Sequence, residues 1–166
     1  MSKSLVVFFS HAGDNYSVGN VSVGNTKHVA DHITALTGAD QFEIVTHKYD
    51  GMAYGPLTKL AQEETKKGDL PEFEGDVPDV SKYDTIYIGG PVWWGTYPRV
   101  MFTFFSKCDL SGKTIIPFST HEGSGIASCE SDVKKAYPGA TVKNAFAIFG
   151  HDCRDGRNKV AKWLGK

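Results

Sequence analysis

The chain alternates short apolar runs with stretches of helical periodicity, and this alternation constrains the fold more than any other feature. Residues 4–9 are apolar after the serine, as in a strand that helices cover on both faces of a parallel sheet. Further strands are predicted at residues 41–46, 85–88, 113–119 and 141–149. Residues 41–46 alternate in polarity, which is typical of an edge strand, and Pro117 is expected near the end of its strand.

Helices are predicted between these strands. One follows Asn25 and stops at Gly38, one opens near Pro56 and stops at Gly68, and one opens at Pro98. Two more carry apolar faces around residues 129–136 and 160–164. The order predicts an α/β fold, an open parallel sheet between two layers of helices.

Size and charge limit the function classes. We expect one domain over residues 1–166. The formal net charge of −1 and the scattered Lys and Arg residues argue against a nucleic-acid partner. The apolar N-terminal run is far too short to span a membrane. Three cysteines without a CxxC pair, namely Cys108, Cys129 and Cys153, favour a reducing, cytoplasmic location.

Ligands of such sheets bind at the carboxyl ends of the strands, and three loops there have suitable chemistry. The first loop, residues 10–24, is rich in Gly, Ser and Asn and leads into a predicted helix, which favours an anion such as phosphate. Residues 19–26 match the G-x-x-x-x-G-K-[ST] spacing, with Asn25 in the place of lysine. Without that lysine, triphosphate hydrolysis is disfavoured, whereas a phosphate monoester still fits. Alternatively, Asn25 and Thr26 only cap the helix.

The other two loops supply aromatic walls and backbone amides. Trp93 and Trp94 are adjacent and cannot both point into one core, so at least one is expected in a cleft, although ordinary packing is the alternative. The loop at residues 120–125 adds small residues and N–H donors. Together the loops fit a planar heteroaromatic phosphate ester. Apolar walls or a carboxylate such as Glu122 make negative charge on the reduced ring costly, which lowers its redox potential.

Other chemistries fit less well. No G-x-S-x-G nucleophile elbow surrounds Ser124. The segment from His151 to Cys153 is a faint metal pattern without a second ligand pair, and a surface turn is the alternative. His11 and His121 lie near the predicted cleft, as proton relays or as simple polar contacts. A receiver domain needs acidic residues that this chain lacks after the first and third strands.

These motifs resemble the flavodoxin family. The pieces that carry the resemblance are Phe9-Ser10, Gly24-Asn25-Thr26, Pro91-Val92-Trp93-Trp94-Gly95 and Thr120-His121-Glu122-Gly123-Ser124-Gly125, in the family's order. The resemblance implies a flavodoxin-like three-layer sandwich with a five-stranded parallel sheet in the order 2-1-3-4-5. It also implies bound FMN, with the phosphate at Ser10, Asn25 and Thr26 and the ring between the second and third loops. The implied cofactor-binding residues are Ser10, His11, Gly24, Asn25, Thr26, Pro91, Val92, Trp93, Trp94, Gly95, Thr120, His121, Glu122, Gly123, Ser124 and Gly125.

The chain departs from many flavodoxins in two respects. An insertion containing Asp14, Asn15 and Tyr16 separates Ser10 from Asn25, and the net charge lacks the strong acidity of typical electron carriers. The first functional hypothesis is an FMN protein that carries electrons between redox partners. The second is an FMN-dependent NAD(P)H reductase of small quinones, azo or nitro compounds, with Trp93, Trp94 and Tyr97 at its mouth. A third, a binding module that has lost its flavin, conflicts with the retained Thr26, Trp94 and Gly95.

Overall fold

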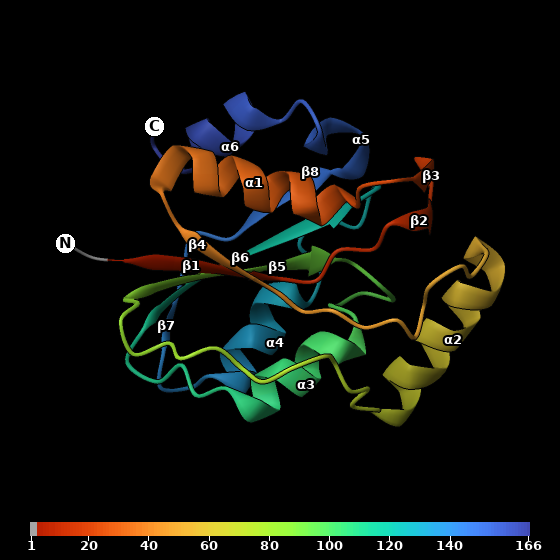
Figure 1. Ribbon diagram of the computed structural model, residues 1–166, viewed down its shortest axis with the longest axis horizontal. Coiled ribbons are helices and arrows are strands. Elements are labelled where there is room, and N and C mark those ends of the chain that lie inside the picture. Colours follow the sequence, from red (N-terminus) through yellow and green to blue (C-terminus); the bar gives the residue numbers. More distant parts are fainter. Residues whose placement is uncertain (1–2) are drawn as a thin grey trace.

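A computed structural model describes residues 3–166, and it contains a parallel sheet between two layers of helices (Figure 1). The central strands are β1 (Ser4–Phe8), β5 (Thr85–Pro91) and β6 (Thr114–His121), and β4 (Asp40–Glu43) pairs with β1 at one edge. At the other edge β6 pairs with β7 (Thr141–Val142) and with β8 (Phe146–Phe149). The order is β4-β1-β5-β6-β7, which confirms the predicted fold class.

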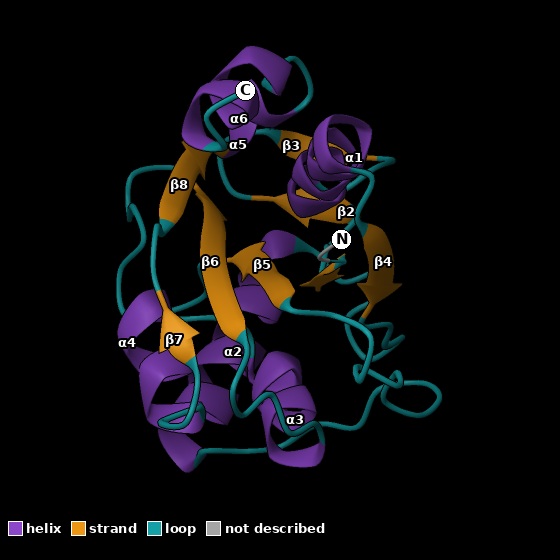
Figure 2. Cartoon of the chain, turned by 90° about the vertical axis from the view of Figure 1, so that its left-hand side faces the viewer, coloured by secondary structure: helices purple, strands orange, loops and turns teal. Residues whose placement is uncertain are grey.

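Two hydrophobic cores lie on opposite faces of the sheet because side chains alternate along each strand. Leu5, Val7 and Phe9 belong to one core, while Val6 and Phe8 belong to the other. Figure 2 shows α1 (Asn25–Thr37), α5 (Gly150–Cys153) and α6 (Arg157–Trp163) on one side of the sheet. On the other side lie α2 (Tyr54–Lys67), α3 (Arg99–Lys107) and α4 (Cys129–Ala136). None of the helices within residues 3–166 is long and apolar enough to cross a membrane.

The predicted helix boundaries are largely confirmed. Gly38 and Gly68 follow α1 and α2 in the left-handed conformation, with φ of 75° and 67°, and their N–H groups bond to carbonyls of the last helical turn. This geometry ends a helix without the steric cost that a side chain would bring. Pro98 immediately precedes α3, as expected.

The third strand is longer than predicted, because β5 continues through Gly89 and Gly90 to Pro91. The predicted strand, residues 85–88, stops before both glycines. Instead, Gly89 pairs with Phe118 of β6, and a Cβ on Gly89 would lie 2.0 Å from the Phe118 ring. The glycine is therefore required by the close approach of a ring, not by a turn.

Two predictions about this edge of the sheet are wrong. One is an uninterrupted fifth strand, and the other is the position of Pro117 near the end of its strand. The fifth strand is divided into β7 and β8, and Pro117 is the fourth of the eight residues of β6. Lys143 donates its N–H to Ile115 O, so the odd-numbered residues of β6 face this edge. Pro117, which has no N–H to offer, faces the gap between the two short strands.

A hairpin within residues 10–24 was not predicted. β2 (Gly13–Asn15) pairs antiparallel with β3 (Gly19–Val21), where a loop was expected. The Asn15 amide donates to the carbonyls of His11 and Gly13, at 2.9 and 3.2 Å, and so ties the hairpin to the segment that follows β1. In Figure 1 the hairpin and α2 lie at the end of the molecule toward which β5 points.

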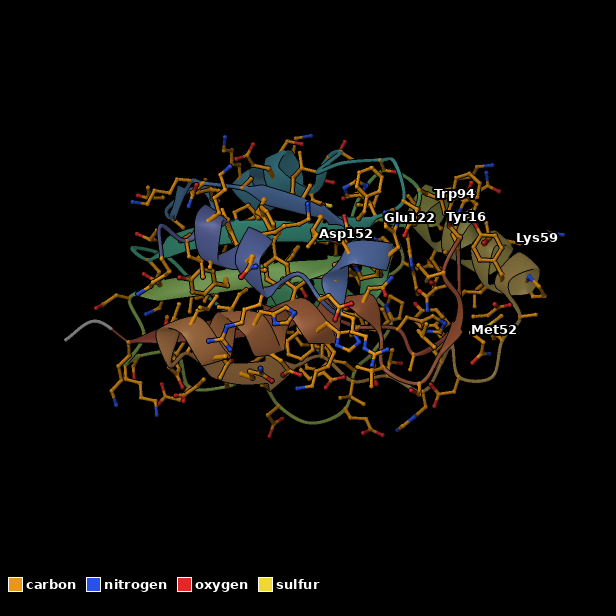
Figure 3. All side chains as sticks on the ribbon, turned by 90° about the horizontal axis from the view of Figure 1, so that it is seen from above. Tyr16, Met52, Lys59, Trp94, Glu122 and Asp152 are labelled. Atoms are coloured by element: carbon orange, nitrogen blue, oxygen red, sulfur yellow. The ribbon has the colours of Figure 1, made fainter. Side chains whose placement is uncertain are left out.

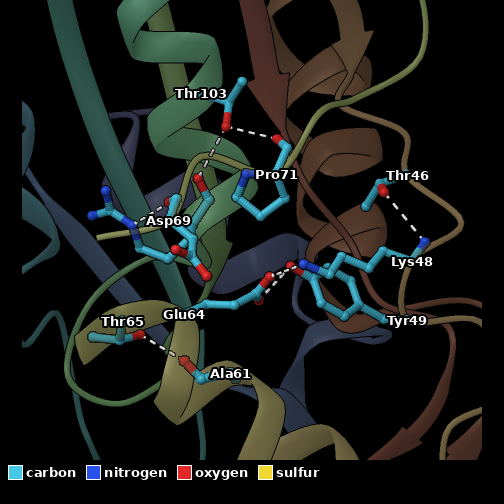
Figure 4. A network of polar contacts seen from close by, with 10 residues as sticks. Thr46, Lys48, Tyr49, Ala61, Glu64, Thr65, Asp69, Pro71 and Thr103 are labelled. Carbon is cyan, nitrogen blue, oxygen red and sulfur yellow. Dashed lines mark hydrogen bonds and ion pairs between the residues drawn. The ribbon is translucent and has the colours of Figure 1, made fainter. Parts of the chain in front are cut away.

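A buried carboxylate fixes α2 against the rest of the molecule (Figure 4). Glu64 is 2% exposed and accepts hydrogen bonds from Lys48 Nζ at 2.5 Å and from the Tyr49 hydroxyl at 2.7 Å. Beyond α2, Arg99 Nε donates to Asp69 O at 2.9 Å. These contacts hold in place the helix that forms one wall of the cavity described next.

Candidate functional site

A cavity of about 360 Å³ opens at the carboxyl ends of β1, β5 and β6, where a parallel sheet is expected to bind its ligand. Its walls come from the three predicted loops and from two further elements, the hairpin and α2. The lining residues are His11, Asp14, Asn15, Tyr16, Asn25, Thr26, Tyr54, Leu57, Thr58, Pro91, Val92, Trp93, Trp94, Gly95, Thr120, His121, Glu122 and Ser124. Twelve of the sixteen residues predicted for the site are in this set, while Ser10, Gly24, Gly123 and Gly125 are not.

The N-terminus of α1 faces the cavity with features that suit an anion. Asn25 and Thr26 line the cavity, no side chain caps the helix at Gly24, and the first turn carries no acidic residue. The Thr26 and Thr120 hydroxyls are 2.9 Å apart and buried. Helix N–H groups and two hydroxyls together form a donor set for a phosphate.

Ser10 and Gly24 support this site from behind rather than lining it. The Ser10 hydroxyl accepts the N–H of Lys27 at 3.0 Å, within the first turn of α1. Gly24 packs so closely that a Cβ would lie 2.2 Å from Ser10 Oγ and 2.8 Å from His11 O. Gly19 belongs to β3, so the G-x-x-x-x-G spacing noted in the sequence spans a hairpin strand and is not one phosphate loop.

The two tryptophans have different environments, although both line the cavity. Trp93 packs edge-on against Phe9 and Tyr49, with ring centroids 5.5 and 5.1 Å apart, and is a fixed wall. Trp94 is 48% exposed, has a φ of 56°, and donates its indole N–H to Thr58 O at 2.8 Å. Trp94 therefore lies at the mouth of the cavity, where its indole hydrogen bond holds it against α2.

The loop after β6 is shaped by bonds within itself. His121 Nδ1 accepts the N–H of Gly123 at 2.9 Å, and the Ser119 hydroxyl donates to Gly125 O at 2.9 Å. Gly123 and Gly125 have φ of 130° and 66°, a conformation that favours glycine. These two glycines shape the turn that presents the neighbouring side chains to the cavity.

Glu122 lines the cavity, and its carboxylate is also held by α5. Its carboxylate accepts the backbone N–H of His151 at 2.8 Å and lies 2.8 Å from His151 Nδ1. Gly150 leaves room for this contact, because a Cβ there would lie 2.9 Å from Glu122 Oε1 and 2.4 Å from the Asn25 amide nitrogen. The segment from His151 to Cys153 thus belongs to α5, and no metal-binding cluster occurs in the described part of the chain.

His11 is the most informative polar residue of the cavity. Its ring is 7% exposed, lies edge-on to Trp93 with centroids 5.8 Å apart, and its Nε2 has no partner within the described chain. Burial lowers the pKa of His11, which keeps the ring neutral at neutral pH. A buried, unpaired ring nitrogen in a cavity wall is available to a ligand.

Six lining residues were missed by sequence reasoning, and all belong to the hairpin or to α2. They are Asp14, Asn15, Tyr16, Tyr54, Leu57 and Thr58. Asp14 accepts the N–H of Tyr54 at 2.9 Å, and the rings of Tyr16 and Tyr54 are 5.7 Å apart. Among the six, Asp14, Asn15 and Tyr16 have a sequence signal, the insertion that separates Ser10 from Asn25. Figure 3 shows Tyr16, Trp94 and Glu122 at the same end of the molecule.

Comparison with known proteins agrees with the fold. The family model described as Flavodoxin matches residues 3–166. A provisionally assigned flavoprotein from Bacteroides uniformis ATCC 8492 is 27% identical, with 99% of each chain covered and a TM-score of 0.75. A flavoprotein in complex with FMN from Lactobacillus acidophilus NCFM is 20% identical, with 99% of each chain covered and a TM-score of 0.69. Flavodoxin 1 from Bacillus cereus is 15% identical, covering 99% of this chain and 98% of its own, with a TM-score of 0.55. No curated protein matched in a sequence search.

Proposed function

Because the chain belongs to the flavodoxin family, we propose that it is an FMN-binding protein that carries electrons between larger redox proteins. The family's cofactor is FMN, which accepts and releases electrons while the protein binds, shields and tunes it. No catalytic side chain is needed for this function.

The residues present fit this cofactor. Asn25, Thr26 and Thr120, with the N-terminus of α1, would hold the phosphate. Trp93 and Trp94 on one side and residues 121–124 on the other would enclose the ring, which is the arrangement that the sequence motifs predicted. The unpaired Nε2 of His11 offers one more polar contact inside the same cavity.

The chain's own side chains set the environment of the bound group. Trp93 and Leu57 bring apolar surface to the cavity, and Trp93 is locked between other rings. Asp14 and Glu122 are the carboxylates of the lining set. Apolar walls and carboxylates both disfavour added negative charge, so they favour a low redox potential.

The charge of the cavity lining favours the carrier over an NAD(P)H-fed reductase. Among the described residues that line the cavity there is no Lys or Arg, while Asp14 and Glu122 contribute negative charge. A nicotinamide dinucleotide would bring at least two further phosphate charges to a lining whose carboxylates, Asp14 and Glu122, repel them. A protein partner would only approach the mouth of the cavity, so the absence of cationic side chains in the lining does not exclude it.

The reductase remains the second candidate because of the exposed aromatic mouth. Tyr16, Tyr54 and Trp94 are 61%, 39% and 48% exposed, and a small planar substrate could stack there. Tyr97, which was expected at this mouth, is instead fully buried, and its hydroxyl donates to Phe118 O at 2.7 Å.

An anaerobic titration of the FMN-loaded protein distinguishes the two candidates. We expect the visible flavin absorbance to be unchanged by NADH or NADPH, and to bleach with dithionite. The dithionite-reduced protein should then pass electrons to an added redox protein. Rapid bleaching by either nicotinamide nucleotide would establish the reductase and contradict the carrier.

A further inference from the structure

Charge is unevenly distributed along the chain. Residues 143–166 hold six Lys and Arg against two Asp and Glu, a net charge of +4 in a chain whose net charge is −1. The preceding 142 residues therefore sum to −5. A protein with an acidic body and a basic C-terminal segment has a strongly oriented electrostatic field.

The cations of this segment are available for binding. Arg154, Arg157, Lys159 and Lys162 are all exposed and lie on or beside α5 and α6. None of the four forms an ion pair within residues 3–166, where Lys27, Lys48 and Lys82 are the Lys and Arg residues that do. An unpaired group of exposed cations attracts an anionic partner without first breaking an internal contact.

This face adjoins the cofactor cavity. A groove of about 520 Å³ runs between β8 and α6, with Lys159 and Lys162 in its lining and the stacked rings of Phe146 and Trp163, 4.5 Å apart, in its wall. His121 lines both this groove and the cavity. Phe149 also lines the groove, is 42% exposed, and has its ring centroid 4.6 Å from that of His121.

We propose that α5, α6 and β8 form the docking face for an acidic one-electron redox protein. Aromatic side chains surrounded by charge are typical of protein interfaces. The four cations are spread from the end of α5 along α6, a distribution that suits a protein surface better than one small anion. Residues 1–142, with a net charge of −5, repel an acidic partner from other surfaces of the protein. The partner is therefore oriented toward the edge of the cavity.

The docking face rests on the proposed carrier function and names its partner. One electron passes between the two proteins in the complex. With reduced ferredoxin as donor, the ferredoxin is oxidised by one electron and this protein is reduced by one, and no covalent bond forms or breaks. Plant-type ferredoxins have strongly negative potentials, low enough to donate to most flavins.

The test is stopped-flow electron transfer from a reduced acidic [2Fe–2S] ferredoxin to the FMN-loaded protein. The variant Lys159→Glu with Lys162→Glu reverses the charge of two of the four cations on the docking face. The control, Lys134→Glu with Lys135→Glu, makes the same change in net charge on α4, on the opposite side of the sheet (Figure 1). We expect about a tenfold or larger loss of the second-order rate at low salt for the first variant, and about a twofold or smaller loss for the control.

A second readout is independent of electron transfer. The affinity of the oxidised protein for oxidised ferredoxin, measured by isothermal titration, should fall in the Lys159/Lys162 variant and be retained in the Lys134/Lys135 variant. Wild-type affinity should also fall as salt is added. If the glutamate variant does not fold, Lys159→Gln with Lys162→Gln replaces it, and a smaller loss in the same direction is expected.

Three results would overturn the docking face: equal losses in both variants, rates that do not respond to salt, or binding of this face to duplex DNA in preference to ferredoxin. A different result would overturn the carrier itself, namely a wild-type protein that binds no FMN or exchanges electrons with neither ferredoxin nor basic cytochrome c.

Discussion

Gly89 and Gly55 are chemically the same residue with opposite structural roles. A Cβ on Gly89 would lie 2.0 Å from the buried Phe118 ring, while one on Gly55, inside α2, meets nothing within 4 Å. Gly89→Ala should therefore destabilise the protein by about 1–3 kcal/mol or more through overpacking. Gly55→Ala should stabilise it by about 0.5–1 kcal/mol, because alanine favours the helix.

Urea unfolding of the two variants and the wild type measures both effects. The ring at residue 118 has no free space on the side of Gly89, so equal stability of Gly89→Ala and wild type would show that the packing between β5 and β6 is described incorrectly.

The buried hydroxyl of Thr26 should recognise phosphate. Thr26→Val keeps the volume of the side chain but removes the hydroxyl that lies 2.9 Å from Thr120 Oγ1. Losing one hydrogen bond to a charged group costs about 1.5–3 kcal/mol, so FMN affinity should fall by roughly ten- to a hundredfold. Riboflavin, which lacks the phosphate, should bind both proteins about equally, and fluorescence titration measures each affinity.

Equal losses for FMN and riboflavin in Thr26→Val would place the phosphate elsewhere. Thr37→Val, at the far end of α1, is a matched control, because the Thr37 hydroxyl bonds only to local backbone. It should leave both affinities unchanged.

At the level of elements, α2 depends on one buried ion pair. Lys48→Met leaves the Glu64 carboxylate, 2% exposed, with the Tyr49 hydroxyl as its remaining partner. Removing one member of a buried pair costs up to 3–5 kcal/mol, and about 1–3 kcal/mol is expected here because Lys48 is 40% exposed.

A second substitution should recover this loss. In the double variant Lys48→Met with Glu64→Gln, the buried charge is gone and the amide oxygen still accepts from Tyr49. Thermal unfolding should show most of the stability restored. A double variant no more stable than Lys48→Met would mean that the lysine acts through packing rather than through charge.

Elements with strong local patterns were predictable from the sequence, and elements defined by contacts between distant segments were not. The glycines at residues 38 and 68 end their helices as local chemistry dictates. By contrast, the break between β7 and β8 depends on Pro117 in a neighbouring strand, and the hairpin depends on contacts of Asp14 and Asn15 with residues outside it. No periodicity encodes such contacts.

The same distinction applies to the site. The three motif loops could be placed at the sheet edge because topology brings the ends of parallel strands together. The unpaired nitrogen of His11 and the bond from Trp94 to α2 arise only in the folded chain. Glu122 was expected as a carboxylate near the ring and does line the cavity, but its contact with His151 of α5, 29 residues away, has no local signal.

For the whole molecule, buried histidines should make the apoprotein less stable in acid. Burial lowers the pKa of His11, His28 and His121 below the ordinary value of 6.5. Below pH 6.5 the unfolded chain binds protons at these residues that the folded chain does not, so stability is lost as pH falls through 6.5. Exposed His47, whose pKa is raised mainly by its hydrogen bond to Asp50, acts in the opposite direction.

Urea unfolding at about pH 7.5 and about pH 5.5 measures the net effect. His11→Gln should reduce this loss, because His11 is the most buried of the three histidines. His47→Gln should instead increase the loss. Identical pH profiles for wild type and His11→Gln would show that the ring is protonated in the folded protein.

The central claim concerns the cavity of the whole molecule, that it is an FMN site. The most direct test is a fluorescence titration of the apoprotein with FMN, in which Trp93 and Trp94 report on the cavity. We predict saturable quenching at one FMN per chain, weakened by inorganic phosphate that competes at the N-terminus of α1. Fluorescence unaffected by FMN would contradict the account.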